Sequence, residues 1–166
     1  CCPPGDAQTA AGTEVDAAAN QMIRFHRIGT ATEEDTLVYR NLEEPKWMFS
    51  TTVTDDGRYL LLTTNDSCDP VNRLYFHDLE SGKRNGDIVS VVKLIDNLEA
   101  EYSYIANEGL SFYFKTNLNA PKYRVIRIDF PEDAGSMSRE ELDAAVAASM
   151  KEIVAETSDV LESAIC

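Results

Sequence analysis

Apolar and polar residues alternate along several short stretches of the chain, as they do in strands that bury one face. Stretches at residues 48–54 and 59–64 flank residues 55–58, which have the sequence Asp-Asp-Gly-Arg. Asp-Gly between two such stretches predicts a hairpin, because glycine adopts positive φ without a steric penalty. Further strands are predicted at residues 72–79 and 91–95. Together the stretches predict a unit of four antiparallel strands.

The same order of elements then recurs along the chain. A second unit is predicted from strands at residues 102–106, 110–116, 123–130 and 151–154. Repetition of a four-stranded unit at intervals of about 50 residues is typical of β-propeller blades. The sequence therefore predicts an all-β fold, a partial propeller with two complete blades. We expect a surface loop (1–20), the end of one blade (21–44), two complete blades (45–98 and 99–157) and the start of another (158–166).

One segment departs from the strand pattern and predicts a short helix at residues 138–150. Ser138 and Glu141 have the spacing of a capping box, and Leu142, Val146 and Met150 recur at helical spacing. The segment lies between the third and fourth strands of the second unit. We expect an insertion on the propeller rim.

Composition and charge narrow the classes of function. The 166 residues are 43% hydrophobic, which is enough for a core. A net charge of −14 argues against nucleic acid and anionic membrane surfaces, because both attract clustered basic residues. No apolar stretch approaches the roughly 20 residues of a membrane span.

The cysteines fit neither a disulfide framework nor a metal site. Cys1, Cys2, Cys68 and Cys166 have no compact spacing, so we expect reduced thiols in a cytoplasmic protein, with no metal or cofactor. Residue 1 is not methionine, and residues 160–166 read as an interrupted strand. On this basis we expect an internal segment of a longer chain.

Several short sequence segments resemble segments of the propeller of the prolyl oligopeptidases. They include residues 44–48 (Glu-Pro-Lys-Trp-Met), 55–59, 68–74 (Cys-Asp-Pro-Val-Asn-Arg-Leu) and 92–97. The resemblance covers about residues 20–130 and the last few residues. It implies a seven-bladed propeller belonging to a serine endopeptidase that cleaves short peptides after proline.

The same resemblance implies what this segment does. In the family the propeller covers the active-site cavity of an α/β-hydrolase domain and helps to line the pocket for the substrate residue two positions before the scissile proline. A methionine and a cysteine contribute there, and by motif they correspond to Met48 and Cys68. Thioether and thiol groups suit a pocket that accepts varied side chains. The alternative is that both are ordinary core residues between blades.

Catalytic residues are not expected in this chain. The α/β-hydrolase nucleophile requires Gly-x-Ser-x-Gly, which is absent from the sequence. His26 and His77 lie in strand patterns, so we expect structural roles for both. We also expect Trp47 to pack between blades and Arg73 to pair with a nearby acid such as Asp69. A non-catalytic propeller that binds protein partners remains the alternative, although WD and kelch motifs are missing.

Overall fold

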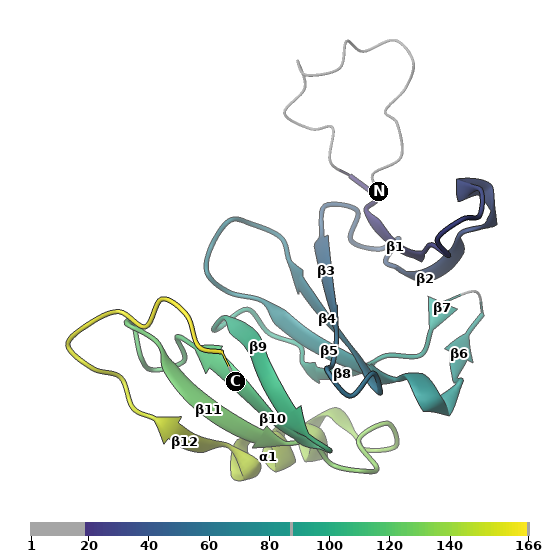
Figure 1. Cartoon of the computed structure of the whole chain (residues 1–166). Coiled ribbons are helices and arrows are strands. Elements are labelled where there is room, and N and C mark those ends of the chain that lie inside the picture. The colour runs from purple at the N-terminus through teal and green to yellow at the C-terminus, as the bar shows by residue number, and fades with distance from the viewer. Residues whose placement is uncertain (1–18, 87, 166) are drawn as a thin grey trace, which may run out of the picture.

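The fold consists of antiparallel β-units arranged side by side, with one helix (Figure 1). The structure, a computed structural model, describes residues 19–86 and 88–165. The strands are β1 (Met22–Phe25), β2 (Thr36–Arg40), β3 (Met48–Val53), β4 (Tyr59–Asn65), β5 (Arg73–Asp78), β6 (Arg84–Asn85), β7 (Ile88–Val89), β8 (Val92–Ile95), β9 (Tyr102–Glu108), β10 (Ser111–Thr116), β11 (Arg124–Asp129) and β12 (Lys151–Val154). The helices are α1 (Arg139–Ser149) and two 3-10 turns, η1 (Thr32–Glu34) and η2 (Leu79–Ser81).

The two predicted four-stranded units both form. Their strand orders are β3-β4-β5-β8 and β12-β11-β10-β9, and the pair β1-β2 precedes them. The predicted hairpin is confirmed between β3 and β4. Its turn closes through hydrogen bonds from Thr54 N to Tyr59 O (2.9 Å) and from Gly57 N to Thr54 O (2.8 Å). Gly57 has a φ of 72°, a left-handed conformation that glycine adopts more readily than other residues do.

The sheet β3-β4-β5-β8 is covered on both faces. Tyr59 and Leu61 of β4 belong to one buried cluster, whereas Leu62 belongs to another that includes Tyr39 of β2. Because successive side chains of a strand point to opposite faces, a strand covered on both sides needs apolar residues throughout. This explains why residues 59–62, Tyr-Leu-Leu-Leu, do not alternate with polar residues as a half-buried strand would.

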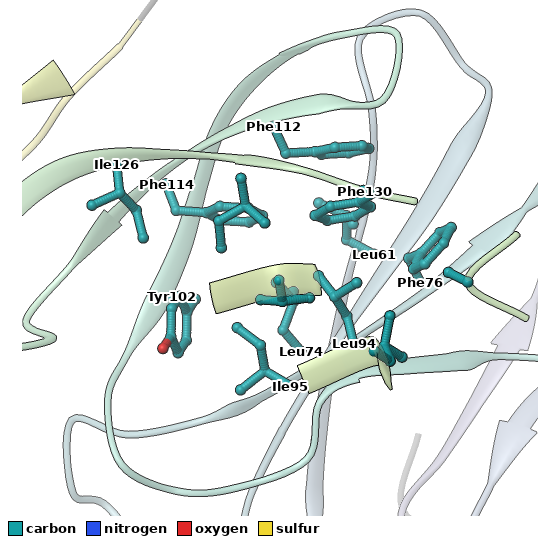
Figure 2. Packing of buried hydrophobic residues seen from close by; sticks show 14 of the residues in the cluster. Leu61, Leu74, Phe76, Leu94, Ile95, Tyr102, Phe112, Phe114, Ile126 and Phe130 are labelled. Carbon is teal, nitrogen blue, oxygen red and sulfur yellow. The ribbon is translucent and has the colours of Figure 1, made fainter. Parts of the chain in front are cut away.

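The larger cluster lies between the two four-stranded sheets and is rich in aromatic rings. Figure 2 shows Phe112, Phe114 and Phe130 from the β9–β12 side facing Leu61 and Phe76 from the other sheet. The rings of Phe112 and Phe130 stack with centroids 3.9 Å apart. Apolar burial of this size, rather than strand pairing, joins the two sheets.

The helix forms where it was predicted, with a complete capping box. Ser138 accepts a hydrogen bond from the backbone of Glu141, whose side chain accepts one from the backbone of Ser138. Leu142 and Val146 are 4% and 6% exposed and join the larger cluster, and α1 contacts β8 and β11. The insertion therefore completes the core between the sheets, which is more than the rim position that we expected.

The structure differs from the prediction in two places, and a third place lies outside the described residues. The short hairpin β6-β7 was not predicted, because two-residue strands leave no alternating pattern. Residues 158–165 form no strand; they follow the sheet through hydrogen bonds from Leu161 N to Lys122 O (2.9 Å) and from Lys115 Nζ to Glu162 O (2.8 Å). Their assignment to a further blade stays a prediction. Of the loop expected at residues 1–20, residues 1–18 lie outside the described residues, as do Cys1, Cys2 and Cys166.

Candidate functional site

A groove of about 510 Å³ opens between the first strands of the two four-stranded sheets. One wall comes from β3, the end of β4 and the loop that follows it, and the other wall comes from residues 101–104 at the start of β9. Ser50, Thr52 and Ser103 contribute hydroxyl groups to the lining, and Leu61 contributes an apolar surface. The groove can therefore offer both hydrogen bonds and apolar contacts to a ligand.

Cys68 lines this groove from the loop after β4. Its thiol is free and its side chain is exposed. Within the loop, Asn65 Nδ2 donates to Ser67 O (3.1 Å), and the Ser67 hydroxyl donates to an Asp69 carboxylate oxygen (3.1 Å). These short-range hydrogen bonds give the loop its local turn. The cysteine is thus presented to solvent by a compact polar segment and is not part of the core.

Met48 lies at the same end of the sheet, on the same face. It opens β3 and pairs with Asn65, three residues before Cys68. Because side chains alternate along a strand, Met48 shares a face with Ser50 and Thr52, both of which line the groove. Met48 is 37% exposed and is not itself a lining residue. Both of the predicted site residues are exposed in this chain.

The segment that carries Met48 is anchored by an ionic and aromatic network. The Arg73 guanidinium lies over the Trp47 ring, 4.2 Å from its centroid, and Arg73 Nε lies 3.6 Å from Asp96 Oδ1. Asp96 is also 3.4 Å from Lys93 Nζ and accepts a hydrogen bond from the Tyr75 hydroxyl. Burial and this hydrogen bond raise the pKa of Tyr75 above its ordinary value, so the phenol stays protonated and donates.

This network corrects one expectation and confirms another. The acid that pairs with Arg73 is Asp96 and not Asp69, because Leu74 pairs with Ile95 and the antiparallel ladder brings the flanking Arg73 and Asp96 together. Trp47 packs against the cluster that includes Tyr39 of the preceding unit. Its expected role in packing between units is therefore confirmed.

The charged groups of the groove are acidic. Asp69 and Glu101 line it, and no lysine or arginine of the described residues does so. The Tyr123 hydroxyl donates to a Glu101 carboxylate oxygen (2.7 Å), and this hydrogen bond raises the pKa of Tyr123. Burial raises the pKa of Tyr102 and of Tyr104. The phenols therefore stay neutral at physiological pH, and the carboxylates set the charge of the groove.

The two histidines lie away from the groove and have structural partners. His77 is 4% exposed, and its Nδ1 lies 2.8 Å from the carbonyl oxygen of Ser90. His26 Nδ1 lies 2.6 Å from Asp35 Oδ1 at the β1-β2 hairpin. Within residues 19–86 and 88–165, neither ring bonds to a serine hydroxyl. This agrees with the structural roles predicted for both residues.

Residues 19–86 and 88–165 contain no group of three or more His, Cys, Asp or Glu side chains arranged to hold a metal ion. None of the helices in this part of the chain has the length and apolar character needed to cross a membrane.

Comparison with known families and sequences gives one consistent answer. Residues 6–166 match the family model described as prolyl oligopeptidase, N-terminal beta-propeller domain. The chain is 38% identical over 123 residues to the dual function macrocyclase-peptidase POPB of Galerina marginata, an alignment that covers 74% of this chain and 16% of that protein. It is 33% identical over 157 residues to the prolyl endopeptidase of Dictyostelium discoideum, covering 92% of this chain and 20% of the relative.

Solved structures agree with the sequence comparison. Prolyl oligopeptidase B from Galerina marginata, bound to a 35mer hydrolysis and macrocyclization substrate, superposes with a TM-score of 0.74 and 32% identity. The match covers 89% of this chain and 19% of that one. The apo form of the same protein gives a TM-score of 0.73 at 31% identity, with the same coverage. This chain thus spans about a fifth or less of the length of the proteins that it matches.

Proposed function

Because the chain belongs to the prolyl oligopeptidase family and matches its N-terminal β-propeller domain, we propose that it works as part of a serine endopeptidase that cleaves short peptides after proline. Its propeller has seven blades, of which β3-β4-β5-β8 and β9–β12 are two. An α/β-hydrolase domain in the same protein supplies the serine, aspartate and histidine. The unpaired thiol of Cys68 fits a cytoplasmic location.

The proposed role of this chain is to gate the active-site cavity and to line part of the substrate pocket. The observation that carries this role is the groove between β3 and β9. Cys68 lines the groove, and Met48 lies on the sheet face that borders it. A propeller encloses a central space with the first strands of its blades, so a groove between two first strands faces that space. Substrates that are too large for the space are excluded.

The soft side chains then act on the substrate residue two positions before the scissile proline. A thioether and a thiol are polarizable and apolar, and methionine changes rotamer at little cost. They contact side chains of different shapes without demanding a particular hydrogen bond, which fits a position of broad preference. The structure of a relative with a bound 35mer substrate supports access of long flexible peptides to this family of enzymes.

Hydrolysis by the full-length protein tests this function. We expect release of the aromatic amine from N-blocked peptides that end in a proline anilide, and no release when alanine replaces proline. Met48→Ala and Cys68→Ala should each raise KM by about three- to tenfold for peptides with a large apolar residue two positions before proline, with little change in kcat. Met150→Ala, at the C-terminal end of α1 and outside the groove lining, is the matched control and should leave KM unchanged.

A full-length protein without activity on any proline peptide would contradict the proposal. A propeller that binds protein partners without catalysis would then be the better account. If the enzyme is active and all three variants behave like the wild type, the peptidase assignment holds and the pocket role of Met48 and Cys68 is wrong.

A further inference from the structure

Asn72 connects the loop that carries Cys68 to the neighbouring sheet. Its backbone N–H donates to Ala100 O (3.0 Å), and its side-chain Oδ1 accepts a hydrogen bond from Tyr102 N (2.7 Å). The Nδ2 group donates to the carbonyl oxygen of Arg73 (3.0 Å). Asn72 is 8% exposed, so these hydrogen bonds form away from water, where losing one leaves a buried polar group without a partner.

Asn117 makes the reciprocal connection from the other sheet. It follows β10, and its Nδ2 group donates to the carbonyl oxygen of Pro70 in the loop (2.9 Å). Its Oδ1 accepts a hydrogen bond from Glu101 N (2.7 Å). One side chain therefore bridges the loop on one wall of the groove and the strand on the other.

The loop has little else to hold it in place. Residues 68–70 are exposed, so burial of apolar side chains does not fix them. Their remaining hydrogen bonds are local, such as Val71 N to Asp69 O (2.8 Å). Exposed segments with few buried contacts open at low free-energy cost, so the hydrogen bonds to the neighbouring sheet decide where this loop lies.

We propose that Asn72 and Asn117 are positioning residues that hold the loop of residues 66–71 against β9 and thereby set the width of the groove. The inference rests on the proposed function, because it assigns to this loop one wall of a substrate pocket. Neither asparagine needs to touch substrate. Both act through Cys68 and its neighbours, whose positions depend on the hydrogen bonds to Pro70, Ala100 and Tyr102.

The opposite end of the same two sheets offers a matched control. There, Asn107 Nδ2 donates to Asp56 Oδ2 across the sheets (2.9 Å) and to Gly109 O (3.1 Å). Asn107→Ala thus removes a connection between sheets, as Asn117→Ala does, together with the hydrogen bond from the Tyr104 hydroxyl to Asn107 Oδ1 (2.7 Å), but leaves the loop of residues 66–71 tied down. General loosening of the two sheets would affect both variants alike.

Hydrogen exchange and kinetics on the full-length protein test the inference. Exchange measured by mass spectrometry on peptides covering residues 66–71 should quicken by about tenfold in Asn72→Ala and in Asn117→Ala and stay unchanged in Asn107→Ala. KM should rise about threefold or more in Asn117→Ala, with kcat retained. Asn117→Asp keeps the acceptor for Glu101 N and loses the donor to Pro70 O, so it should also quicken exchange of the loop. This variant keeps the test valid if the alanine variant folds poorly.

Two results would overturn the inference, and they differ from failure of the proposed function. Unchanged exchange of residues 66–71 in the Asn72 and Asn117 variants shows that the loop is held by something else. Faster exchange with unchanged KM in an active enzyme shows that the loop does not shape the substrate pocket. Absence of any proline-specific activity in the wild-type protein counts against the proposed function, while the exchange measurement still decides whether the asparagines hold the loop.

Discussion

Replacing Arg73 with alanine removes the cation that joins Trp47 to Asp96 next to the groove. The Arg73 side chain is only 16% exposed, and its guanidinium lies 4.2 Å from the centre of the Trp47 ring and 3.6 Å from Asp96 Oδ1. The substitution leaves Asp96 with Lys93 and Tyr75 as partners. It also exposes one face of the indole that precedes Met48.

The expected loss of stability follows from these contacts. A partly buried cation–π contact contributes about 1 kcal/mol. An ion pair between side chains that are 16% and 28% exposed lies between the surface case and the fully buried case, and Asp96 keeps two partners, so its loss costs about 1 kcal/mol more. We therefore expect Arg73→Ala to lower the free energy of unfolding by about 2 kcal/mol.

Urea denaturation of the full-length protein, followed by far-ultraviolet circular dichroism, measures this loss. Arg58→Ala is the control, because Arg58 also pairs with two acids, Asp78 (3.3 Å) and Glu80 (3.7 Å), and lies over an aromatic ring, Tyr59. Its side chain is 47% exposed, however, and water screens its interactions. We expect Arg58→Ala to unfold at nearly the wild-type urea concentration. Equal destabilisation by both substitutions would show that burial does not set the size of the loss, since burial is the main difference between the two sites.

Two further predictions concern the core and the pH dependence of stability. Phe112→Ala, at a fully buried ring, should lower the free energy of unfolding by about 3–5 kcal/mol, whereas Phe25→Ala, at a ring that is 63% exposed, should have little effect; comparable urea midpoints for the two would contradict this. Hydrogen bonds from Ser111 and Arg127 hold the pKa of Asp129 below its ordinary value of 3.8, so its ionised form stabilises the fold above that pH. The stability difference between wild type and Asp129→Asn should be constant at neutral pH and shrink as pH falls through 3.8 and below, and a difference that grows on acidification would count against it.

The strands of the two four-stranded sheets were predictable from sequence because their determinants are local. The alternation of residues 48–54 and the Asp-Gly turn at residues 55–58 specify one hairpin without reference to the rest of the chain. The same holds for α1, whose capping box connects Ser138 with Glu141 within a single turn of helix. Met48 and Cys68 came from the resemblance to a family, and the structure adds that both belong to one face and one end of the same sheet.

The connections between residues far apart in the sequence could not be predicted, because they depend on register and on packing. The pairing of Arg73 with Asp96 requires Leu74 to lie opposite Ile95, and the sequence does not specify that alignment. The role of Asn72 requires the backbone of Tyr102, which lies 30 residues away in another sheet. An asparagine at the start of a predicted strand was the one available indication, and asparagine at such a position more often serves a turn.

In the proposed function, this chain supplies part of the pocket for the substrate residue two positions before the scissile proline. The most direct test is a proline-containing peptide that carries a photoreactive benzophenone at that position, cross-linked to the full-length enzyme and mapped by mass spectrometry. We expect cross-links to Met48 or to residues 65–71, and we expect an unlabelled substrate to reduce their yield by competition. Cross-links that form elsewhere and spare both segments would contradict this proposal.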